Sequence, residues 1–286
     1  MFVNTLKFNL IKIFSNRYFG NNCFNLGIFL LLSAPSISVI FLLISVIINS
    51  LSFKENYFKD KGNFIFIASS IFLLVTTFIN NFYSSPNLEG YENYLSWVGL
   101  FNWIPYFYCL WAFKPYLNTN KLRKKTALFL ISGSLPLFLT GIGQYWFGWH
   151  GPLKVFGGLI IWFQRAPGSN EGLTGLFNNP NYAGSWFVIL LPFLIAFCLE
   201  KTNSKLKRFI SFLMLTITII LIHYTKSRNA LLGSIISIQF LTTSKALLFS
   251  LVTLIILFST ILLLGKLSII SYNNDLMRQI NYNFFW

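Results

Sequence analysis

The sequence predicts an all-α, polytopic integral membrane protein with about nine membrane segments. Its 286 residues are 55% hydrophobic and only 10% charged, whereas an average soluble protein has about 25% charged residues. Apolar runs long enough to cross a bilayer as helices follow one another along the chain. Short clusters of Lys and Arg separate these runs, which is typical of the cytoplasmic loops of multi-span proteins.

The predicted membrane segments are read from the apolar runs. A bilayer core takes about 20 residues of helix, and most runs meet or approach that length. Single helices are predicted over residues 63–82, 96–113, 126–144, 182–199, 209–224, 229–241 and 246–265. The first apolar region, 24–49, contains Pro35 in the sequence SAPS. It fits either one long helix or two short helices broken at this proline.

The distribution of Lys and Arg predicts the orientation, because basic loops stay in the cytoplasm. The basic loops are residues 50–62, 114–125 and 200–208. Loop 83–95 has two acidic residues and no basic one, so it is expected outside. The N-terminal arm is also basic, so both ends of 24–49 lie on the cytoplasmic side, which favours a hairpin broken at Pro35. The N-terminus is then cytoplasmic and the C-terminus external.

These assignments divide the chain into three parts in the inner or plasma membrane. Residues 1–23 form an amphipathic cytoplasmic arm, 24–265 a multi-span membrane domain, and 266–286 an external tail. Within the external segment 145–181, the apolar stretch 153–163 is too short to span. We expect this stretch to lie at the outer interface or to re-enter the membrane, given its Trp and Phe residues.

The composition argues against several function classes. The net charge is +15, but the basic residues lie between apolar runs rather than on one soluble face, so nucleic acid is not an expected partner. The three cysteines and two histidines are scattered. They have neither the pattern of a disulfide framework nor the spacing of metal ligands. No metal site and no cofactor is expected.

A polar cluster interrupts the apolar sequence at GLTGLFNNPNYAG, Gly172–Gly184. It lies where span 182–199 enters the membrane from outside. The Asn-Pro step forces a turn and prevents the helix from extending backwards, and Asn181 is a suitable N-cap. A loop with a cap would explain Asn178 and Asn181, but it does not explain Arg165 upstream.

A second polar cluster is HYTKSRNALLG, His223–Gly233, which is also predicted at the outer face. Lys226 and Arg228 must lie near the membrane boundary, and Ser227 or Asn229 is expected to cap the next helix. The helices after both clusters point their positive N-terminal ends outward, where free N–H groups bind anions.

Two interpretations of the arginines remain. Each side chain extends to lipid headgroups, or Arg165 and Arg228 use their planar guanidinium groups to bind phosphate oxygens. The outer face is poor in basic residues, which favours an anionic ligand. Only six of the 22 Lys and Arg residues are predicted there: Lys154, Arg165, Lys226, Arg228, Lys266 and Arg278.

The order and spacing of the two clusters resemble those of the O-antigen ligase/polymerase superfamily, in particular its cyanobacterial members. The usual pattern is an Arg, a G-x-F-x-NPN turn, and then SR with a small residue at a helix start. This chain has FQRAPGSNEGLTGLFNNPNYAG and then TKSRNALLG. The likeness covers residues 126–286. It implies a glycosyltransferase-C-like fold that transfers a glycan, without a metal, from a polyprenyl-pyrophosphate donor to a lipid or glycan acceptor at the outer face.

The resemblance also implies roles for individual residues. Arg165 and Arg228 would stabilise the pyrophosphate leaving group, and Lys226 would add a point charge. Asn178, Asn181 and Ser227 would contact the substrate, and Arg278 lies near a position where members often carry an arginine.

The sequence ends with DLMRQINYNFFW, which resembles the start of the family's large external loop. The family's large external loop carries a histidine, and neither His150 nor His223 matches it. We therefore expect a C-terminally shortened or split member, which is inactive alone or acts with a second chain that carries the missing half.

Other functions stay open at this stage. The chain fits a glycan polymerase as well as a ligase, and an inactive remnant or a partner subunit is a further reading. A carrier for a small anion such as bicarbonate is an alternative from another class. A carrier should show ionisable residues inside the membrane or paired broken helices in two halves, and the sequence shows neither. The sugar and the acceptor are not specified by these patterns.

Overall fold

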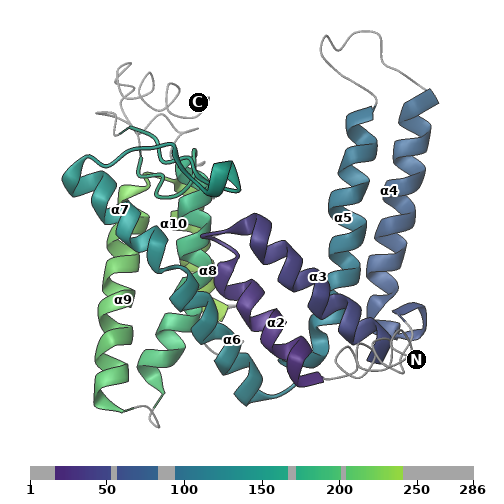
Figure 1. Cartoon of the computed structure of the whole chain (residues 1–286), viewed down its shortest axis with the longest axis horizontal. Helices are drawn as coiled ribbons and strands as arrows, with labels where there is room; N and C mark the ends of the chain where they lie inside the picture. The colour runs from purple at the N-terminus through teal and green to yellow at the C-terminus, as the bar shows by residue number, and fades with distance from the viewer. Residues whose placement is uncertain (1–16, 53–56, 83–93, 167–171, 201–203, 241–286) are drawn as a thin grey trace, which may run out of the picture. The chain divides into compact units, whose positions relative to one another are not determined.

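The computed structural model describes residues 17–52, 57–82, 94–166, 172–200 and 204–240, which are mostly helical (Figure 1). Five stretches within these residues are long and apolar enough to cross a membrane: Pro35–Ser52, Lys61–Phe82, Asn120–Phe147, Pro180–Leu199 and Lys205–Tyr224. The predicted helical architecture is confirmed for the described residues, and these five stretches have the length and composition of membrane spans.

The remaining predicted segments are shorter or less apolar. Helix α5, Tyr94–Phe113, has 20 residues and no charged side chain, but its Tyr, Trp and Asn residues make it less apolar than the other five. Helix α2, Arg17–Leu30, has 14 residues, and α10, Arg228–Phe240, is described over 13. Helix α2 and the described part of α10 are each shorter than the roughly 20 residues that a bilayer core requires. The predicted span 246–265 lies outside the described residues, so the number nine stays a prediction.

Two compact units make up the described residues. The first unit comprises the described parts of Met1–Ala183 together with Tyr224–Lys226. The second comprises those of Gly184–His223 and Ser227–Trp286.

The first apolar region folds as two helices. Helix α2 ends at Leu30, and α3, Pro35–Ser52, begins at the proline, which lacks an N–H group and therefore suits a first helical turn. The Ser38 hydroxyl donates a 2.7 Å hydrogen bond to the Gly27 carbonyl and so joins the two helices. The predicted break at Pro35 is confirmed.

Short connecting segments follow α3 and α5: two lead from α3 to α4 (Phe64–Phe82), and one leads from α5 towards the next helix. These segments are the 3-10 turns η1 (Tyr57–Lys59), η2 (Lys61–Asn63) and η3 (Lys114–Leu117). Lys114 Nζ lies 2.9 Å from Asp60 Oδ2, and Asn49 Nδ2 donates to the Ala112 carbonyl at 2.6 Å.

We call residues 57–63 and 114–125 the basic end of the first unit. They carry one acid, Asp60, and seven cations: Lys59, Lys61, Lys114, Lys121, Arg123, Lys124 and Lys125.

The predicted single span 126–144 is divided at Ser134 into α6, Asn120–Gly133, and α7, Leu135–Phe147. Pro136 occupies the first turn of α7, where its missing N–H costs least. Gly133 is required by packing, because a Cβ atom at this position would lie 2.0 Å from the Phe29 carbonyl oxygen. The backbone of α2 therefore crosses α6 at this glycine.

The stretch 153–163 is a β-hairpin. Strands β1, Leu153–Val155, and β2, Ile160–Trp162, pair antiparallel, and the turn η4, Phe156–Gly158, joins them. Gly157 and Gly158 have φ angles of 65° and 96°, a conformation that glycine adopts without strain. The hairpin adds a small β element to the predicted all-α class.

The hairpin lies beside the turn between α2 and α3, because Trp162 Nε1 donates to the Ser33 carbonyl at 2.8 Å. We call residues 31–34, 148–166, 172–179 and 224–226 the hairpin end. The start of α2 lies at the basic end, where Gly20 adjoins the Tyr116 hydroxyl. The described parts of loops 50–62 and 114–125, two of the three loops that the charge pattern placed on one side, thus share an end of the first unit. The side on which loop 200–208 lies, and the identity of the cytoplasmic side, stay predictions.

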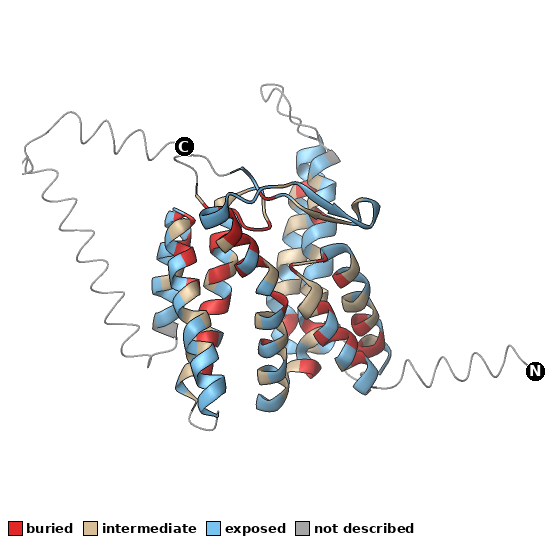
Figure 2. Cartoon of the chain, turned by 60° about the vertical axis from the view of Figure 1, so that its left-hand side comes forward, coloured by how far each residue is buried: buried red, intermediate tan, exposed pale blue. Residues whose placement is uncertain are grey.

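The second unit contains most of α8, Pro180–Leu199, and of α9, Lys205–Tyr224, together with α10. Phe187, Leu190, Leu191 and Leu194 are buried, and their spacing of three and four residues places them on one face of α8. Gly233 of α10 packs against Val188, 3.2 Å from the position of a Cβ atom. Exposed residues cover much of the helical surface (Figure 2), and many of them are large and apolar, as expected of helices that face lipid.

Candidate functional site

Arg165 is held at the hairpin end by its backbone. Gln144, near the end of α7, is 3% exposed and donates from Nε2 to the Arg165 carbonyl at 3.0 Å. The Arg165 N–H donates to the Thr174 hydroxyl at 3.2 Å. The side chain of Arg165 is exposed and has no hydrogen bond or ion pair with the described residues. Its backbone is therefore fixed, and its guanidinium group is available to a ligand.

The Gln144 carboxamide joins α7 to the segment after Arg165. Its oxygen accepts hydrogen bonds from the N–H groups of Thr174 and Gly175, both at 2.9 Å. Its nitrogen also donates to the Thr174 hydroxyl at 3.1 Å. Gln144 and Thr174 are both buried, so the donors and acceptors in this cluster satisfy one another away from water.

A second buried glutamine supports the same region. Gln164 is 1% exposed and donates to the Thr140 carbonyl of α7 at 2.9 Å. Its own carbonyl accepts from the Gly151 N–H at 2.8 Å. The residue before Arg165 thus connects α7 with the start of the β-hairpin.

The two polar clusters of the sequence meet in the first unit. The Leu173 N–H donates to the Tyr224 carbonyl at 2.9 Å. At Gly172 a Cβ atom would lie 1.8 Å from the Thr225 carbonyl oxygen, so only glycine allows this approach. The ring of Tyr224 also packs on Tyr145, with centroids 3.9 Å apart. Segment 172–174 and the turn 224–226 therefore form one local structure.

The turn before α10 exposes two cations on either side of a buried cap. Lys226 is exposed and has a φ angle of 53°. Ser227 is 3% exposed, and its hydroxyl accepts from the Ala230 N–H at 3.2 Å, which makes it the N-cap of α10. Of the two predicted caps, Ser227 is the one observed. Arg228 begins α10 and is exposed.

The N-cap prediction at the NPN turn is wrong. Asn179, rather than Asn181, caps α8, because its Oδ1 accepts from the Asn181 N–H at 2.8 Å. Pro180 is then the first helical residue, a position that proline favours. Asn178 and Asn181 are both exposed.

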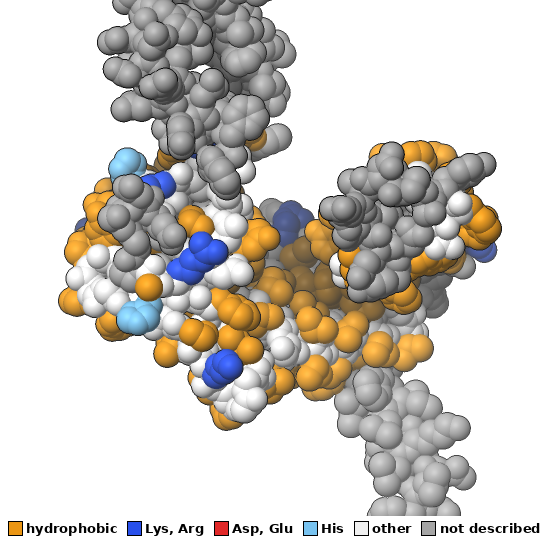
Figure 3. All heavy atoms as spheres, turned by 90° about the horizontal axis from the view of Figure 1, so that it is seen from above, with side chains coloured by type: hydrophobic (Ala, Val, Ile, Leu, Met, Phe, Trp, Pro, Cys, Tyr) orange, Lys and Arg blue, Asp and Glu red, His pale blue; other side chains and the backbone are white. Residues whose placement is uncertain are grey.

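The other predicted site residues do not join this local structure. Arg228 and Ser227 belong to the second unit, although Arg228 follows Lys226 by two positions in the chain. Arg278 lies outside the described residues. His150 is exposed, with Nδ1 3.1 Å from the Gly148 carbonyl, and His223 is exposed near the end of α9. Seen from above, hydrophobic side chains cover much of the coloured surface, and Lys, Arg and His form a few small patches (Figure 3).

The sequence reasoning missed the two buried glutamines and Thr174. The signal for Gln144 was a single amide residue in the apolar run LPLFLTGIGQYWF, since a buried polar side chain needs partners. Within the described parts of the chain, no group of three or more His, Cys, Asp or Glu residues forms a possible metal site. No family model, curated protein or solved structure matches the chain.

Proposed function

We propose that the hairpin end binds the pyrophosphate of a polyprenyl-linked glycan at the outer face of the membrane, in a glycan-transfer reaction of the O-antigen ligase or polymerase kind. Arg165 and Lys226 would contact the phosphate oxygens from the first unit. Arg228, two residues after Lys226 in the chain, would add the second guanidinium group.

The observation that supports this proposal best is the Leu173–Tyr224 hydrogen bond. Arg165 and Lys226 are far apart in the sequence, yet their supporting segments form one structure at one end of the first unit. A pyrophosphate carries several oxygens and is bound best by cations on more than one segment. Two exposed cations on rigid segments meet this requirement with little ordering cost.

The chemical role follows from the charge that develops on the leaving group. When the acceptor hydroxyl displaces the polyprenyl pyrophosphate, negative charge grows on the bridging oxygen. Prearranged cations stabilise this charge without reorganising at the moment of reaction. The described residues supply cations for the leaving group. Arg165, Lys226 and Arg228 would therefore bind the pyrophosphate and stabilise it as the leaving group. A different group would accept the proton of the acceptor hydroxyl.

The test is binding of an undecaprenyl pyrophosphate analogue to the purified full-length chain in detergent. The chain would be compared with Arg165→Ala, Lys226→Ala and Arg228→Ala. A charge-assisted contact contributes about 1.5–3 kcal/mol, so each arginine variant should bind about 10- to 150-fold more weakly. Arg→Lys should also weaken binding, because lysine lacks the planar fork.

Lys154→Ala is the matched control. Lys154 is an exposed cation on β1 at the same end, but it belongs to neither polar cluster. The Lys154→Ala variant should bind the undecaprenyl pyrophosphate analogue with an affinity within about twofold of that of the unmodified chain. If Lys154→Ala weakens binding as much as Arg165→Ala, a diffuse charge effect replaces the assigned site. Unchanged affinity in folded Arg165→Ala and Arg228→Ala proteins would refute the proposal.

A further inference from the structure

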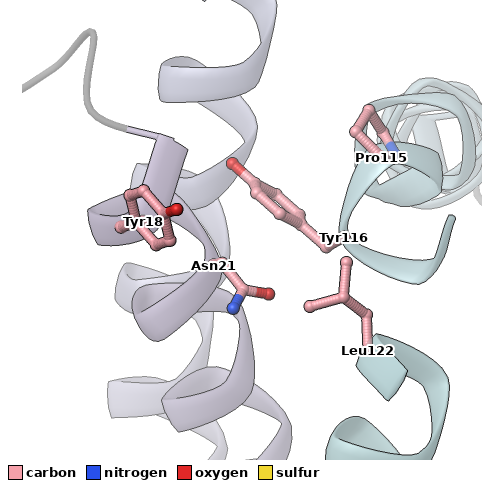
Figure 4. A pocket seen from close by; sticks show the side chains of 5 residues that line it. All are labelled: Tyr18, Asn21, Pro115, Tyr116 and Leu122. Carbon is pink, nitrogen blue, oxygen red and sulfur yellow. The ribbon is translucent and has the colours of Figure 1, made fainter. Parts of the chain in front are cut away.

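A pocket of about 270 Å³ lies at the basic end of the first unit, away from the site proposed above. Tyr18 and Asn21 of α2 form one side, and Pro115, Tyr116 and Leu122 of the segment from η3 to α6 form the other (Figure 4). Its volume is close to the lower end of the range for small-molecule pockets, about 300–1,000 Å³. It therefore fits a headgroup-sized ligand rather than a whole lipid.

The pocket has rigid, largely apolar walls and a polar side chain at one side. Tyr116 is 1% exposed, and its hydroxyl donates to the Ser45 carbonyl at 2.9 Å, which fixes its ring in the wall. Asn21 Oδ1 accepts from Asn25 Nδ2 at 3.2 Å. The Asn21 amide hydrogens have no acceptor among the described residues and can donate to a ligand. This combination suits an amphiphile with oxygen acceptors.

The charge around the pocket is strongly positive. Leu122 of the lining lies between Lys121 and Arg123, and Lys124 and Lys125 follow, with no acid in residues 114–133. The Arg123 guanidinium donates to the Leu117 carbonyl at 2.9 Å and to Asn120 Oδ1. These partners are neutral, so they hold the guanidinium in place without cancelling its charge. An anion is the ligand that this field attracts.

The position of the pocket relative to the apolar part of α6 identifies the anion. The helix changes from the basic sequence NKLRKK to the apolar sequence TALFLISG at Thr126, so the pocket lies where a span leaves the hydrocarbon region. Lipid headgroups occupy this level, and basic pockets between helices at the cytoplasmic face bind acidic ones. The N-terminal residues 1–16 carry Lys7 and Lys12 and no acid, so their sequence offers no carboxylate as a ligand for this pocket.

We propose that this pocket binds the phosphate headgroup of an anionic phospholipid. Lys121, Arg123 and Lys125 attract the phosphate, Asn21 donates to its oxygens, and the apolar walls contact the glycerol and first acyl carbons. The site is independent of the glycan-transfer proposal, because it uses none of the same residues and lies at the opposite end of the first unit.

The test uses the full-length chain in a neutral detergent. Dioctanoyl phosphatidylglycerol, dioctanoyl phosphatidylcholine and glycerol phosphate are titrated separately, and binding is followed by calorimetry and native mass spectrometry. Phosphatidylglycerol should bind at least about 10-fold more tightly than either other compound. Each cation near the surface contributes about 1 kcal/mol, so the pair Lys121→Gln/Lys125→Gln should weaken phosphatidylglycerol binding about 5- to 30-fold.

Two further variants keep the proposal falsifiable. The pair Lys205→Gln/Lys207→Gln removes the same charge from another basic segment, where both lysines are exposed, and should change the affinity less than about twofold. Asn21→Leu should weaken binding about 10-fold through the lost hydrogen bond to a charged group. An unfolded variant is identified by its melting temperature without lipid.

Four results would overturn the proposal. Equal affinity for the two lipids would exclude headgroup selection. An equal loss in the control pair would indicate diffuse charge attraction. Wild-type affinity in a folded Asn21→Leu protein would place binding outside the pocket. Glycerol phosphate binding as tightly as the lipid would identify a soluble phosphate ligand instead.

Discussion

Replacing Gln144 with leucine should remove the main support of the Arg165 segment. The substitution keeps an apolar side chain of similar size in α7 but deletes the carboxamide. The N–H groups of Thr174 and Gly175 then lose their acceptor, and both residues are buried. An unsatisfied buried donor costs about 1–3 kcal/mol, so two donors cost about 2–6 kcal/mol in the free energy of unfolding. Water that enters the cavity would lower this cost.

Gln164→Leu is the matched control, because Gln164 is similarly buried but its side chain, among the residues that the structure describes, donates only to the Thr140 carbonyl. That carbonyl lies inside α7 and also accepts the N–H four residues later. Losing the side-chain bond should therefore cost only about 0.5–1.5 kcal/mol. Gln144→Leu should therefore lower the free energy of unfolding several times more than Gln164→Leu.

The assay combines reversible unfolding in mixed micelles with amide hydrogen exchange. Unfolding reports the total loss of stability, and exchange of residues 173–176 reports whether the loss is local. Gln144→Leu should accelerate exchange in this peptide, and Gln164→Leu should alter it much less. If the two variants lose equal stability, or if exchange of 173–176 is unchanged in Gln144→Leu, the role assigned to Gln144 is wrong.

Two further predictions concern a helix cap and a surface ion pair. Ser227→Ala should cost about 1 kcal/mol of stability, the usual effect of losing an N-cap. Ser234→Ala, which deletes only a hydroxyl bonded back to the Ala230 carbonyl of its own helix, should cost less than half as much by the same unfolding assay. The hydrogen bonds that Asp60 accepts from Lys114 and the Gly62 N–H lower the pKa of its carboxyl below 3.8. Because the folded pKa is the lower one, the stabilisation is present at pH 5 and above and is lost as the pH falls through the folded value. The melting temperatures of the wild type and Asp60→Asn should therefore differ at pH 6, and the difference should shrink as the pH falls below 3.8; a difference that stays constant down to the lowest pH measured would refute this linkage.

The features that the sequence predicted correctly depend on local backbone chemistry. Pro35 lacks an N–H, so a helix begins there whatever surrounds it. Ser227 stands immediately before a helical run, where a hydroxyl can reach the free N–H groups. The same reasoning went wrong at Asn181, because Pro180 itself occupies the first helical position and transfers the cap to Asn179. The rule for proline at this position would have identified the cap from the sequence.

The features that the sequence did not predict depend on partners far along the chain. The acceptors and donors of Gln144 lie on the loop around Arg165 and Thr174, which has no periodic pattern to place it beside α7. The β-hairpin was hidden because each of its strands has only three residues, too few for an alternating pattern to stand out, and only the Gly157-Gly158 pair marks its turn. The crossing of α2 and α6 at Gly133 was not predicted either, because a glycine in an apolar helix does not indicate which backbone segment packs against it.

The hydrogen bond between Leu173 and Tyr224 has a consequence for the order of events during synthesis. The carbonyl of Tyr224 appears only after α8 and α9 have been made, roughly 50 residues later. At about 5–20 residues per second, segment 172–174 waits about 3–10 seconds for this partner. During that time Gln144, already made, is the anchor that can hold the Arg165 loop. The hydrogen bonds of this loop to Gln144 can thus form first, and the bond to Tyr224 can form only after α9 has been made.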